Sequence, residues 1–468
     1  MSLLLGLLDR KGSDATKRTI EELKRGSPAK ADCYGIASKA DCIPRIHNDS
    51  LIRDAYTALG YKLVKIEELD NPQPMMQESQ AVAFIGRLLD STEPSFLAFA
   101  NAIRENSDED LRLLYQFDGS FSAVTLVNDC FTLYRDTLGV IPLYYGINQD
   151  YTAVASNSKI LRNLGLVPER VKPGYISKLN VNSILEKKIS HIERPQEVEV
   201  SEEEAMSYLD QLLIESLNRR VKKHNSPTIA FSGGVDSSLL TYYAMRAGAK
   251  PHLECVGVEG STDFRASLEA ADALGLRVSQ HLLSLSDVER MLPEVIESIE
   301  ETDPMKVGVA LPLYVVARNA QIHGSKVVLS GNGCDELFGG YSKYFNKGID
   351  PREEMYLDLI NSHAVNLERD WKICADIGVE LRLPYTDRRL VEFGLKLPLN
   401  YKLSLKSGER KIIIRKLAKK AGFPDAISNR AKKAAQYSSG VSKAMNKLAK
   451  CRKLTVKDYL RSLGRFNN

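Results

Sequence analysis

The most constraining feature of this sequence is a short polar loop between an apolar strand pattern and a helical pattern. The loop, FSGGVDSS at residues 231–238, follows PTIAF and opens the helical run SSLLTYYAMRAG. Two glycines let a backbone approach an anion without a Cβ in the way, and a helix N-terminus offers unpaired N–H groups to it. The pattern therefore predicts an anion-binding turn at the end of a strand.

The sequence on either side of this loop changes its pattern near residue 200. After it, strand-like PHLECVGV and KVVLSG alternate with helical runs such as ASLEAADALG. This alternation indicates a parallel sheet with helices on both faces. Before it, short β-like runs recur between Gly, Asn and Asp residues, which is typical of an antiparallel β-rich domain: AVAFIGRLL, FSAVTLV, CFTLYRD, YTAVAS and GYISKLN.

A chain of 468 residues is long enough for two domains. We predict an α+β, layered β-rich domain at residues 1–190 and an α/β parallel-sheet domain at 205–468. The acidic stretch PQEVEVSEEE suits a linker, which we place at 191–204.

Composition narrows the class of protein. Hydrophobic residues make up 43% of the chain, yet no apolar run approaches the length needed to cross a membrane. The opening MSLLLGLL is short, and we expect a buried strand there rather than a signal peptide. Seven scattered cysteines without a CxxC pair indicate reduced thiols, a cytoplasmic location and no zinc site.

The side chains of the loop suggest which anion it binds. Ser232, Ser237 and Ser238 would add hydroxyl donors to the backbone of Gly233 and Gly234. Asp236 is anomalous beside an anion unless a cation lies between them, so Mg²⁺ is implied. The loop lacks the GxxxxGK[ST] pattern. It resembles the pyrophosphate-binding loop of the ATP pyrophosphatases, which implies cleavage of ATP to AMP and pyrophosphate.

A second motif, LSGNGCDELFGGY at residues 329–341, resembles the signature of the asparagine synthetase family. It also follows a strand pattern, and Asp335 is the natural partner of Asp236 for one Mg²⁺ ion on a triphosphate. The resemblance continues through CADIGVELRLPYTDRRLVEF and GERKIIIRKL. The latter segment places Lys411 at the position of the family's catalytic lysine, which contacts the phosphates.

Nucleotide contacts follow from the same resemblance. Phe231 and Val256 correspond to positions whose backbone holds the adenine, and Ser330 and Gly331 to positions near the ribose and α-phosphate. Each lies at the carboxyl end of a predicted parallel strand, where open α/β sheets bind their ligands.

The first 185 residues resemble the family's other half, an N-terminal-nucleophile glutaminase, most closely in RDTLGVIPLYYG at 135–146. Its catalytic positions are altered. Ser2 replaces the nucleophilic cysteine, Lys62 replaces the arginine for the glutamine carboxylate, and Ile85-Gly86-Arg87 replaces Asn-Gly-Glu. We therefore expect this domain not to hydrolyse glutamine.

The chain's last 68 residues carry 19 lysines and arginines against three acidic residues. This excess of positive charge could bind nucleic acid or the phosphates of ATP. Its few aromatic residues are not interleaved as a stacking platform, which disfavours nucleic acid. Most of these lysines are expected on solvated helix surfaces.

The resemblance implies ATP- and Mg²⁺-dependent amide synthesis by carboxylate adenylation, with ammonia as nitrogen donor. It allows a separate glutaminase partner and a homodimer, and gives no role to a membrane. Two departures concern the substrate: Asn332 stands where the family carries Glu, and residues 304–308 lack its Thr-Thr-x-Arg element. A β-lactam-synthetase-like enzyme acting on another carboxylate and amine, or a non-catalytic nucleotide-binding subunit, remain as alternatives. The intact loop, Asp335 and Lys411 disfavour the last.

Overall fold

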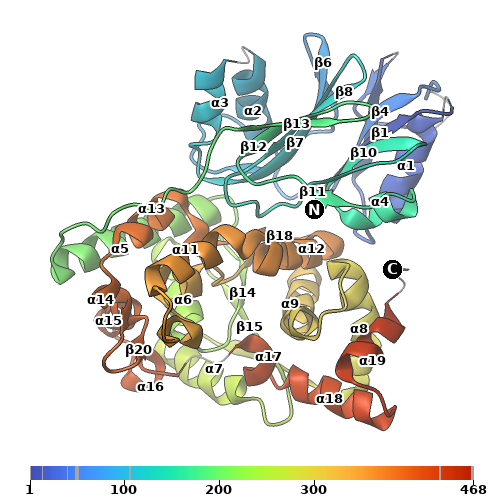
Figure 1. Cartoon of the computed structure of the whole chain (residues 1–468). Coiled ribbons are helices and arrows are strands. Elements are labelled where there is room, and N and C mark those ends of the chain that lie inside the picture. The colour runs from blue at the N-terminus through green and yellow to red at the C-terminus, as the bar shows by residue number, and fades with distance from the viewer. Residues whose placement is uncertain are drawn as a thin grey trace. The chain divides into compact units, whose positions relative to one another are not determined.

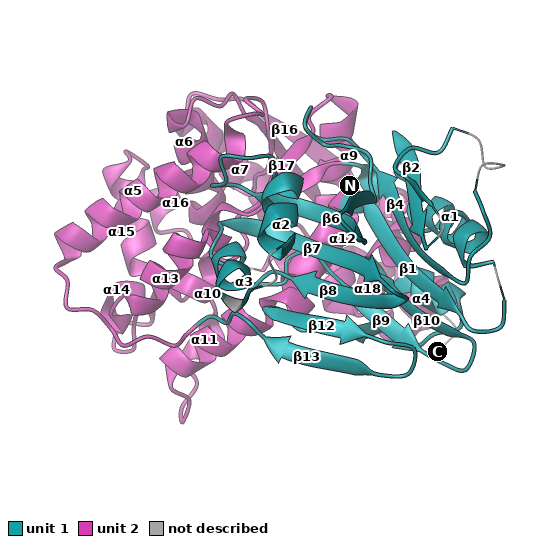
Figure 2. Ribbon diagram, turned by 90° about the horizontal axis from the view of Figure 1, so that it is seen from above, with its two compact units in different colours: residues 1–192, 375–378 teal, residues 193–374, 379–468 magenta. Residues whose placement is uncertain are grey.

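The computed structural model describes residues 2–12, 14–39, 41–47, 52–104, 107–431 and 434–464 of the chain. It contains two units, drawn in separate colours in Figure 2. Unit 1 comprises residues 1–192 and 375–378, and unit 2 comprises residues 193–374 and 379–468.

Unit 1 is built on two antiparallel sheets. The first sheet has the order β11 (Glu169–Arg170), β9 (Tyr144–Ile147), β10 (Tyr151–Ala155), β1 (Leu3–Asp9), β4 (Thr57–Leu63), β2 (Cys33–Ser38) and β3 (Cys42–Ile43). The second has the order β13 (Ile184–Lys188), β12 (Tyr175–Leu179), β8 (Cys130–Arg135), β7 (Gly119–Val127), β6 (Gln80–Leu88) and β5 (Met75–Gln77). The predicted β-like runs all fall in these strands.

Helices cover the outer faces of the two sheets. Helix α1 (Ala15–Arg25) packs on β1, β2 and β4, and α2 (Ser95–Arg104) packs on β6; α3 (Asp108–Leu114) and α4 (Ser158–Asn163) complete the unit. Between the sheets, β1 and β4 contact β6 and β7. Every residue of β1 is buried, which explains the apolar start of the sequence. The predicted layered fold is confirmed.

Unit 2 contains a parallel five-stranded sheet. Its order is β16 (Val278–Leu283), β15 (His252–Val258), β14 (Thr228–Ala230), β17 (Val327–Leu329) and β18 (Glu380–Arg382). The chain runs outward from β14 to β16 and then returns to β17 on the other side of β14. This reversal is a topological switch point, and a crevice forms there at the carboxyl ends of the strands.

Helices pack against this sheet, as the strand-helix alternation predicts. Helices α6 (Val235–Arg246) and α7 (Thr262–Ala273) contact β14 and β15, and α9 (Pro304–Ile322) contacts β14, β15 and β17 (Figure 1). The other α-helices before β18 are α5 (Glu202–Val221), α8 (Leu285–Ile299), α10 (Cys334–Phe338), α11 (Pro351–Ser362) and α12 (Glu368–Ile377), and a 3-10 helix, η2, spans Ser342–Phe345. Residues 375–377 of α12 are assigned to unit 1. A π-helical segment, η3 (His363–Leu367), joins α11 to α12.

The secondary structure at the expected linker differs from the prediction. Helix α5 begins at Glu202, inside the expected linker, because Ser201 and Glu204 form a capping box there. The acidic residues 202–204 are therefore its first turn, where negative charge complements the helix dipole. Residues 191–200 have no regular secondary structure.

The basic C-terminal part of unit 2 is helical and packed. It contains α13 (Arg388–Lys396), α14 (Leu399–Lys402), α15 (Ile412–Lys420), α16 (Asp425–Ser428), α17 (Ala435–Ser438), α18 (Val441–Cys451), α19 (Val456–Leu463) and the hairpin of β19 (Leu403–Ser404) and β20 (Glu409–Arg410). Among its described lysines, Lys402 and Lys411 are buried and the others are exposed. All seven cysteines are free thiols, and no described helix is long and apolar enough to span a bilayer.

Candidate active site

The polar loop after β14 forms the tight turn that its glycines predict. The N–H of Phe231 donates to the carbonyl of Glu254 at 2.9 Å, which ties the start of the loop to β15. Gly233 has φ +68°, and a Cβ there would lie 2.3 Å from the carbonyl of Ala266 in α7. Only glycine combines that conformation with that close approach.

The hydroxyl groups of the loop do not all face the same way. Ser232 and Ser237 lie with their Oγ atoms 3.4 Å apart, and both line a cavity beside the loop. Ser238 is fully buried in α6 and is not part of the cavity wall. Successive helical residues point about 100° apart, so the neighbouring hydroxyls of Ser237 and Ser238 do not face the same way. The contact expected from Ser238 stays a prediction, and its burial away from both cavities does not support it.

Two carboxylates and one ammonium meet at the switch point. The Lys411 Nζ atom lies 2.5 Å from Asp236 Oδ2 and 2.6 Å from Asp335 Oδ1. Asp236 is in the first turn of α6 after β14, and Asp335 is in α10 after the neighbouring strand β17. The structure thus brings together three residues that lie as much as 175 positions apart in the sequence.

Burial and charge act against each other at Lys411, which is 1% exposed. Burial acts to lower the pKa of its ammonium, but the charges of Asp236 and Asp335 outweigh this, and the pKa lies above its ordinary value. Burial also raises the pKa of the Cys334 thiol, which donates to Asp236 Oδ1 at 3.2 Å. The lysine therefore stays charged, and the carboxylates are held in fixed positions.

The surrounding backbone is fitted closely to this cluster. Lys411 has φ 56°, in the left-handed region, and stands at the N-terminus of α15. Gly340 lies directly against the cluster: a Cβ there would fall 1.7 Å from Asp335 Oδ1 and 2.6 Å from Lys411 Cε. The site has no room for one additional carbon atom at this point.

Two adjoining cavities open beside the cluster. The larger, about 180 Å³, is lined by the expected nucleotide residues Phe231, Val256, Ser330 and Gly331 and by an apolar wall from α9. The smaller, about 90 Å³, is lined by Ser232, Gly234 and Asp236 together with four cations. These are Arg410, Lys411, Arg415 and Arg430. The larger cavity therefore offers one apolar wall, from α9, against which a flat ring could lie, and the smaller offers positive charge to anions.

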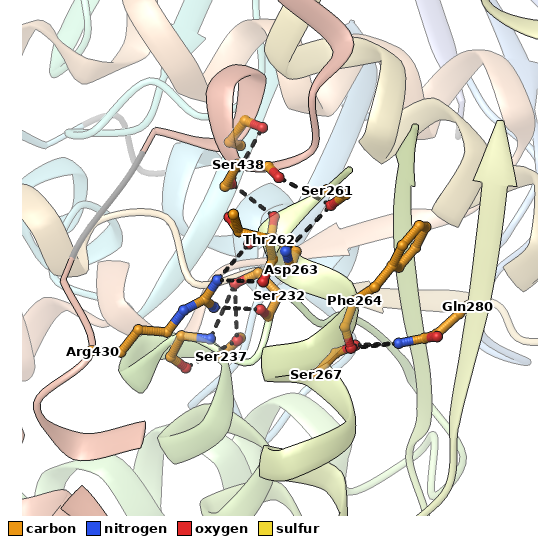
Figure 3. Close-up of polar contacts among 12 residues, drawn as sticks. Ser232, Ser237, Ser261, Thr262, Asp263, Phe264, Ser267, Gln280, Arg430 and Ser438 are labelled. Carbon is orange, nitrogen blue, oxygen red and sulfur yellow. Dashed lines mark hydrogen bonds and ion pairs between the residues drawn. The ribbon is translucent and has the colours of Figure 1, made fainter. Parts of the chain in front are cut away.

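An arginine clamp joins the loop to the following strand end (Figure 3). Arg430 donates to the carbonyls of Ser232 at 2.8 Å and Thr262 at 3.1 Å, and it pairs with Asp263 Oδ1 at 2.9 Å. The other oxygen of Asp263 accepts from Ser438 Oγ at 2.7 Å. These contacts fix the backbone of the loop from the basic C-terminal part of the chain.

A further buried acid lines the larger cavity. The Asn332 side-chain amide donates to Asp370 Oδ2, and Arg369 Nε donates to Asp370 Oδ1 at 2.6 Å. Asp370 lies in α12, and it is 3% exposed. The sequence singles out Asn332 but gives no signal for its partner.

The acid pair has the donor chemistry that magnesium needs. No group of three or more metal-ligating His, Cys, Asp or Glu side chains gathers anywhere in the described residues. Mg²⁺ is commonly bound by one or two carboxylates, with phosphate and water oxygens completing its shell. Asp236 and Asp335, which already converge on one cation, fit that requirement.

The altered glutaminase positions of unit 1 are bonded internally. The Ser2 hydroxyl accepts from the Val64 N–H at 3.1 Å, and Lys62 Nζ donates to the Ser27 carbonyl at 2.7 Å. Arg87 pairs with Asp70 through contacts of 2.6 and 2.9 Å. Ile85 is buried, and a Cβ at Gly86 would fall 2.1 Å from the Ser120 carbonyl.

The comparison with known families agrees with this geometry. The model of the asparagine synthase family matches residues 208–352 and 347–467, more than half of the chain. The chain belongs to the asparagine synthase family. The model of a glutamine amidotransferase domain matches residues 62–163 in unit 1.

Individual members of the asparagine synthase family share moderate identity with the chain. A Methanocaldococcus jannaschii protein assigned by name as a glutamine-hydrolysing asparagine synthetase is 32% identical over 71% of this chain. The glutamine-hydrolysing asparagine synthetase 2 of Arabidopsis thaliana is 29% identical over 65% of it. These matches span 68% of the archaeal protein and 54% of the plant protein.

Proposed function

We propose that this protein is an ATP-dependent amide synthetase that forms AMP and pyrophosphate, with aspartate and ammonia as the first substrates to test. The observation that carries the proposal is the Lys411 ammonium between Asp236 and Asp335, at the carboxyl ends of adjacent parallel strands. Membership of a ligase family supports the same reading.

The first step would be transfer of the adenylyl group to a carboxylate. A carboxylate oxygen attacks the α-phosphorus, the bond to the bridging oxygen breaks, and pyrophosphate leaves with the electron pair. Asp236 and Asp335 would hold Mg²⁺, which neutralises charge on the triphosphate. Lys411, a point charge on a flexible stem, would follow the charge that moves onto pyrophosphate.

The loop and the basic cavity would orient the phosphates for this step. The backbone of Gly234 and the hydroxyls of Ser232 and Ser237 face the cavities. Arg430 would stiffen the loop through the Ser232 carbonyl. Phe231 and Val256 lie in the larger cavity, where adenine would rest against the apolar wall of α9.

Free ammonia or an amine is proposed as the nitrogen source. In unit 1, Arg87 is committed to Asp70, and Lys62 is bonded to the Ser27 carbonyl. A glutamine molecule would therefore meet none of the groups that the resemblance associates with its hydrolysis.

A second candidate is an amide synthetase for a carboxylate other than aspartate. Aspartate carries a second carboxylate that needs a cation. Lys306, the cation of residues 304–308, lies 2.6 Å from Glu301 and donates to the Ala364 carbonyl at 3.0 Å. Because this lysine already has two partners, an acid without an α-carboxylate is favoured as the alternative substrate.

The test measures the nucleotide products with Mg²⁺, ammonium chloride and a panel of carboxylic acids that begins with L-aspartate. Equal amounts of AMP and pyrophosphate are expected, and ADP with phosphate as the products would refute the assignment. Asp236→Asn and Asp335→Asn should each abolish AMP formation. Asp272→Asn, an exposed position on α7, is the matched control.

A further inference from the structure

Five acidic residues line the larger cavity, and each of them has a partner within the fold. Asp236 and Asp335 hold Lys411, Asp263 holds Arg430 and Ser438, and Glu254 contacts His281 and Asn319. The fifth acid is Asp370. Its partners, Asn332 and Arg369, leave its carboxylate at the cavity wall.

The contacts of Asp370 orient the carboxylate and leave it acceptor capacity. Asn332 donates to Oδ2, and Arg369 donates to Oδ1. An ionised carboxylate has about four lone-pair positions, so each oxygen keeps one for a further donor. Because Asp370 is 3% exposed, a donor inside the cavity would meet little competition from bulk water.

An irregular, π-helical turn precedes the helix that carries Asp370. The π-helical segment η3 separates α11 from α12, and such segments are frequent at functional sites. Arg369 also donates to Asn366 Oδ1 at 3.3 Å, and Asn366 in turn donates to Glu336 Oε1 at 3.0 Å. These bonds tie the π-helical turn to α10, which carries Asp335. The position of Asp370 relative to Asp335 is thereby fixed.

We infer that Asp370 accepts the proton of the nitrogen nucleophile when the amide bond forms, an inference that rests on the proposed function. The nitrogen lone pair attacks the acyl carbon of the acyl-adenylate and forms the C–N bond. One N–H proton passes to an oxygen of Asp370. The bond between the acyl carbon and the phosphate oxygen breaks, and AMP leaves with that electron pair. Atoms and charge balance without any further reactant.

This role separates the two half-reactions of the enzyme. Adenylation involves no N–H group, so it does not need Asp370. Amide formation requires removal of a proton from nitrogen, and general base catalysis typically contributes 10²- to 10⁴-fold. A merely structural Asp370 would affect both half-reactions together.

The experiment measures both half-reactions in the full-length protein. Exchange of radiolabelled pyrophosphate into ATP reports adenylation, with L-aspartate, L-glutamate and β-alanine as the carboxylate probes. Ammonium-dependent AMP release reports amide formation. Asp370→Asn should keep exchange within about threefold of wild type and lower amide formation about 100-fold. Asp358→Asn on α11, which loses contacts to Lys343 and Tyr344 in the preceding 3-10 turn, is the matched control and should change neither rate.

Exchanging the amide of Asn332 and the carboxylate of Asp370 tests whether a carboxylate at this wall of the cavity is required. The double variant Asn332→Asp with Asp370→Asn keeps one amide and one carboxylate in contact. It should recover at least about tenfold over Asp370→Asn in amide formation, because a carboxylate returns to the cavity wall. A parallel thermal melt confirms that each variant is folded.

The outcomes are distinct. Unchanged amide formation in Asp370→Asn, or an equal fall in both half-reactions, overturns the inference and leaves the proposed function standing. A double variant no better than Asp370→Asn also counts against it. Formation of ADP and phosphate by the wild-type protein overturns the proposed function and this inference with it.

Discussion

Unit 1 and unit 2 both have the fold that the sequence predicts, but the polar side chains at their expected sites are arranged differently. In unit 1, Ser2, Lys62 and Arg87 are each bonded to neighbouring protein groups. In unit 2, Asp236, Asp335 and Lys411 converge where two cavities meet. The positions that the resemblance assigns to glutamine hydrolysis are thus engaged within unit 1, whereas the charged residues of unit 2 border open cavities.

The motif that survives in unit 1 shows why its fold persists. Arg135 is fully buried and donates to the carbonyls of Ile141, Val171 and Gly139 at 3.1, 2.6 and 2.7 Å. The carboxylate of Asp136 accepts from three backbone N–H groups, and burial raises its pKa to about 6. The segment RDTLG thus has a structural task that is independent of glutamine hydrolysis.

The largest expected effect comes from removing the central cation of unit 2. Lys411→Ala should lower AMP formation by about 10²-fold or more, the scale of one lost contact in a transition state. Lys411→Arg should not restore full activity, because its planar fork distributes the charge differently. Pyrophosphate release with a thermal melt gives the measurement.

Lys419→Ala and Lys447→Ala are the controls for this loss, since both lysines are exposed. Near-normal activity of Lys411→Ala, together with an essential role for either control, would show that the wrong lysine has been placed at the centre of the site.

A steric change should come next in size. Gly340→Ala adds one carbon where the nearest atoms are the ends of the Asp335 and Lys411 side chains. We expect a fall of about tenfold or more in AMP formation with little loss of stability, because small misplacements of reacting groups are costly. Gly394→Ala in α13, where a Cβ would keep 3.3 Å from Leu337, is the matched control. Equal effects of the two variants would contradict the prediction.

Removing the clamp should have a smaller effect. Arg430→Ala releases the Ser232 carbonyl and leaves Asp263 without its cation. A hydrogen bond to a charged group contributes about 1.5 kcal/mol or more, so kcat/KM for ATP should fall about tenfold. Steady-state kinetics at varied ATP give the answer, with exposed Arg461→Ala on α19 as the control. An unchanged kcat/KM would show that Arg430 does not contribute to the use of ATP.

No effect at all is expected from restoring the missing nucleophile in unit 1. Ser2→Cys, with the initiator methionine removed, should release no glutamate from glutamine. Arg87 would still be held by Asp70, and Lys62, whose pKa is lowered by burial, would still face the Ser27 carbonyl. A coupled glutamate assay measures this. Glutamate release by Ser2→Cys would show that one substitution gives unit 1 glutaminase activity, and it would contradict the contrast between the two units.

The sequence predicted those features that depend on neighbouring residues. Short β-like runs between Gly, Asn and Asp residues located strands β6, β7, β8, β10 and β12 of unit 1. The succession of strand, loop and helix patterns located the loop at 231–238 and the parallel sheet around it. The convergence of Asp236 and Asp335 followed because the carboxyl ends of adjacent parallel strands meet at one edge. Lys411 required the family resemblance.

The parts that escaped prediction are held by long-range contacts. Arg430 reaches the Ser232 carbonyl across 198 positions, and within the basic C-terminal part it resembled any other surface cation. Asp370 follows a π-helical segment, whose irregular turn has no signature in the 3.6-residue periodicity of apolar side chains. Ser238 was expected to act beside Ser237, but successive residues of a helix point in different directions and Ser238 is buried in α6.

Gly340 also bears on how a gene for this protein can change. Every single-base change in a glycine codon that alters the amino acid introduces a side chain with a Cβ. At Gly340 that atom would collide with Asp335 and Lys411. Any amino-acid replacement that arises from one base change would therefore disturb the site, so selection for activity is expected to keep glycine at this position. A lineage that no longer needs the reaction would be free to replace this glycine, and its loss would mark an abandoned site.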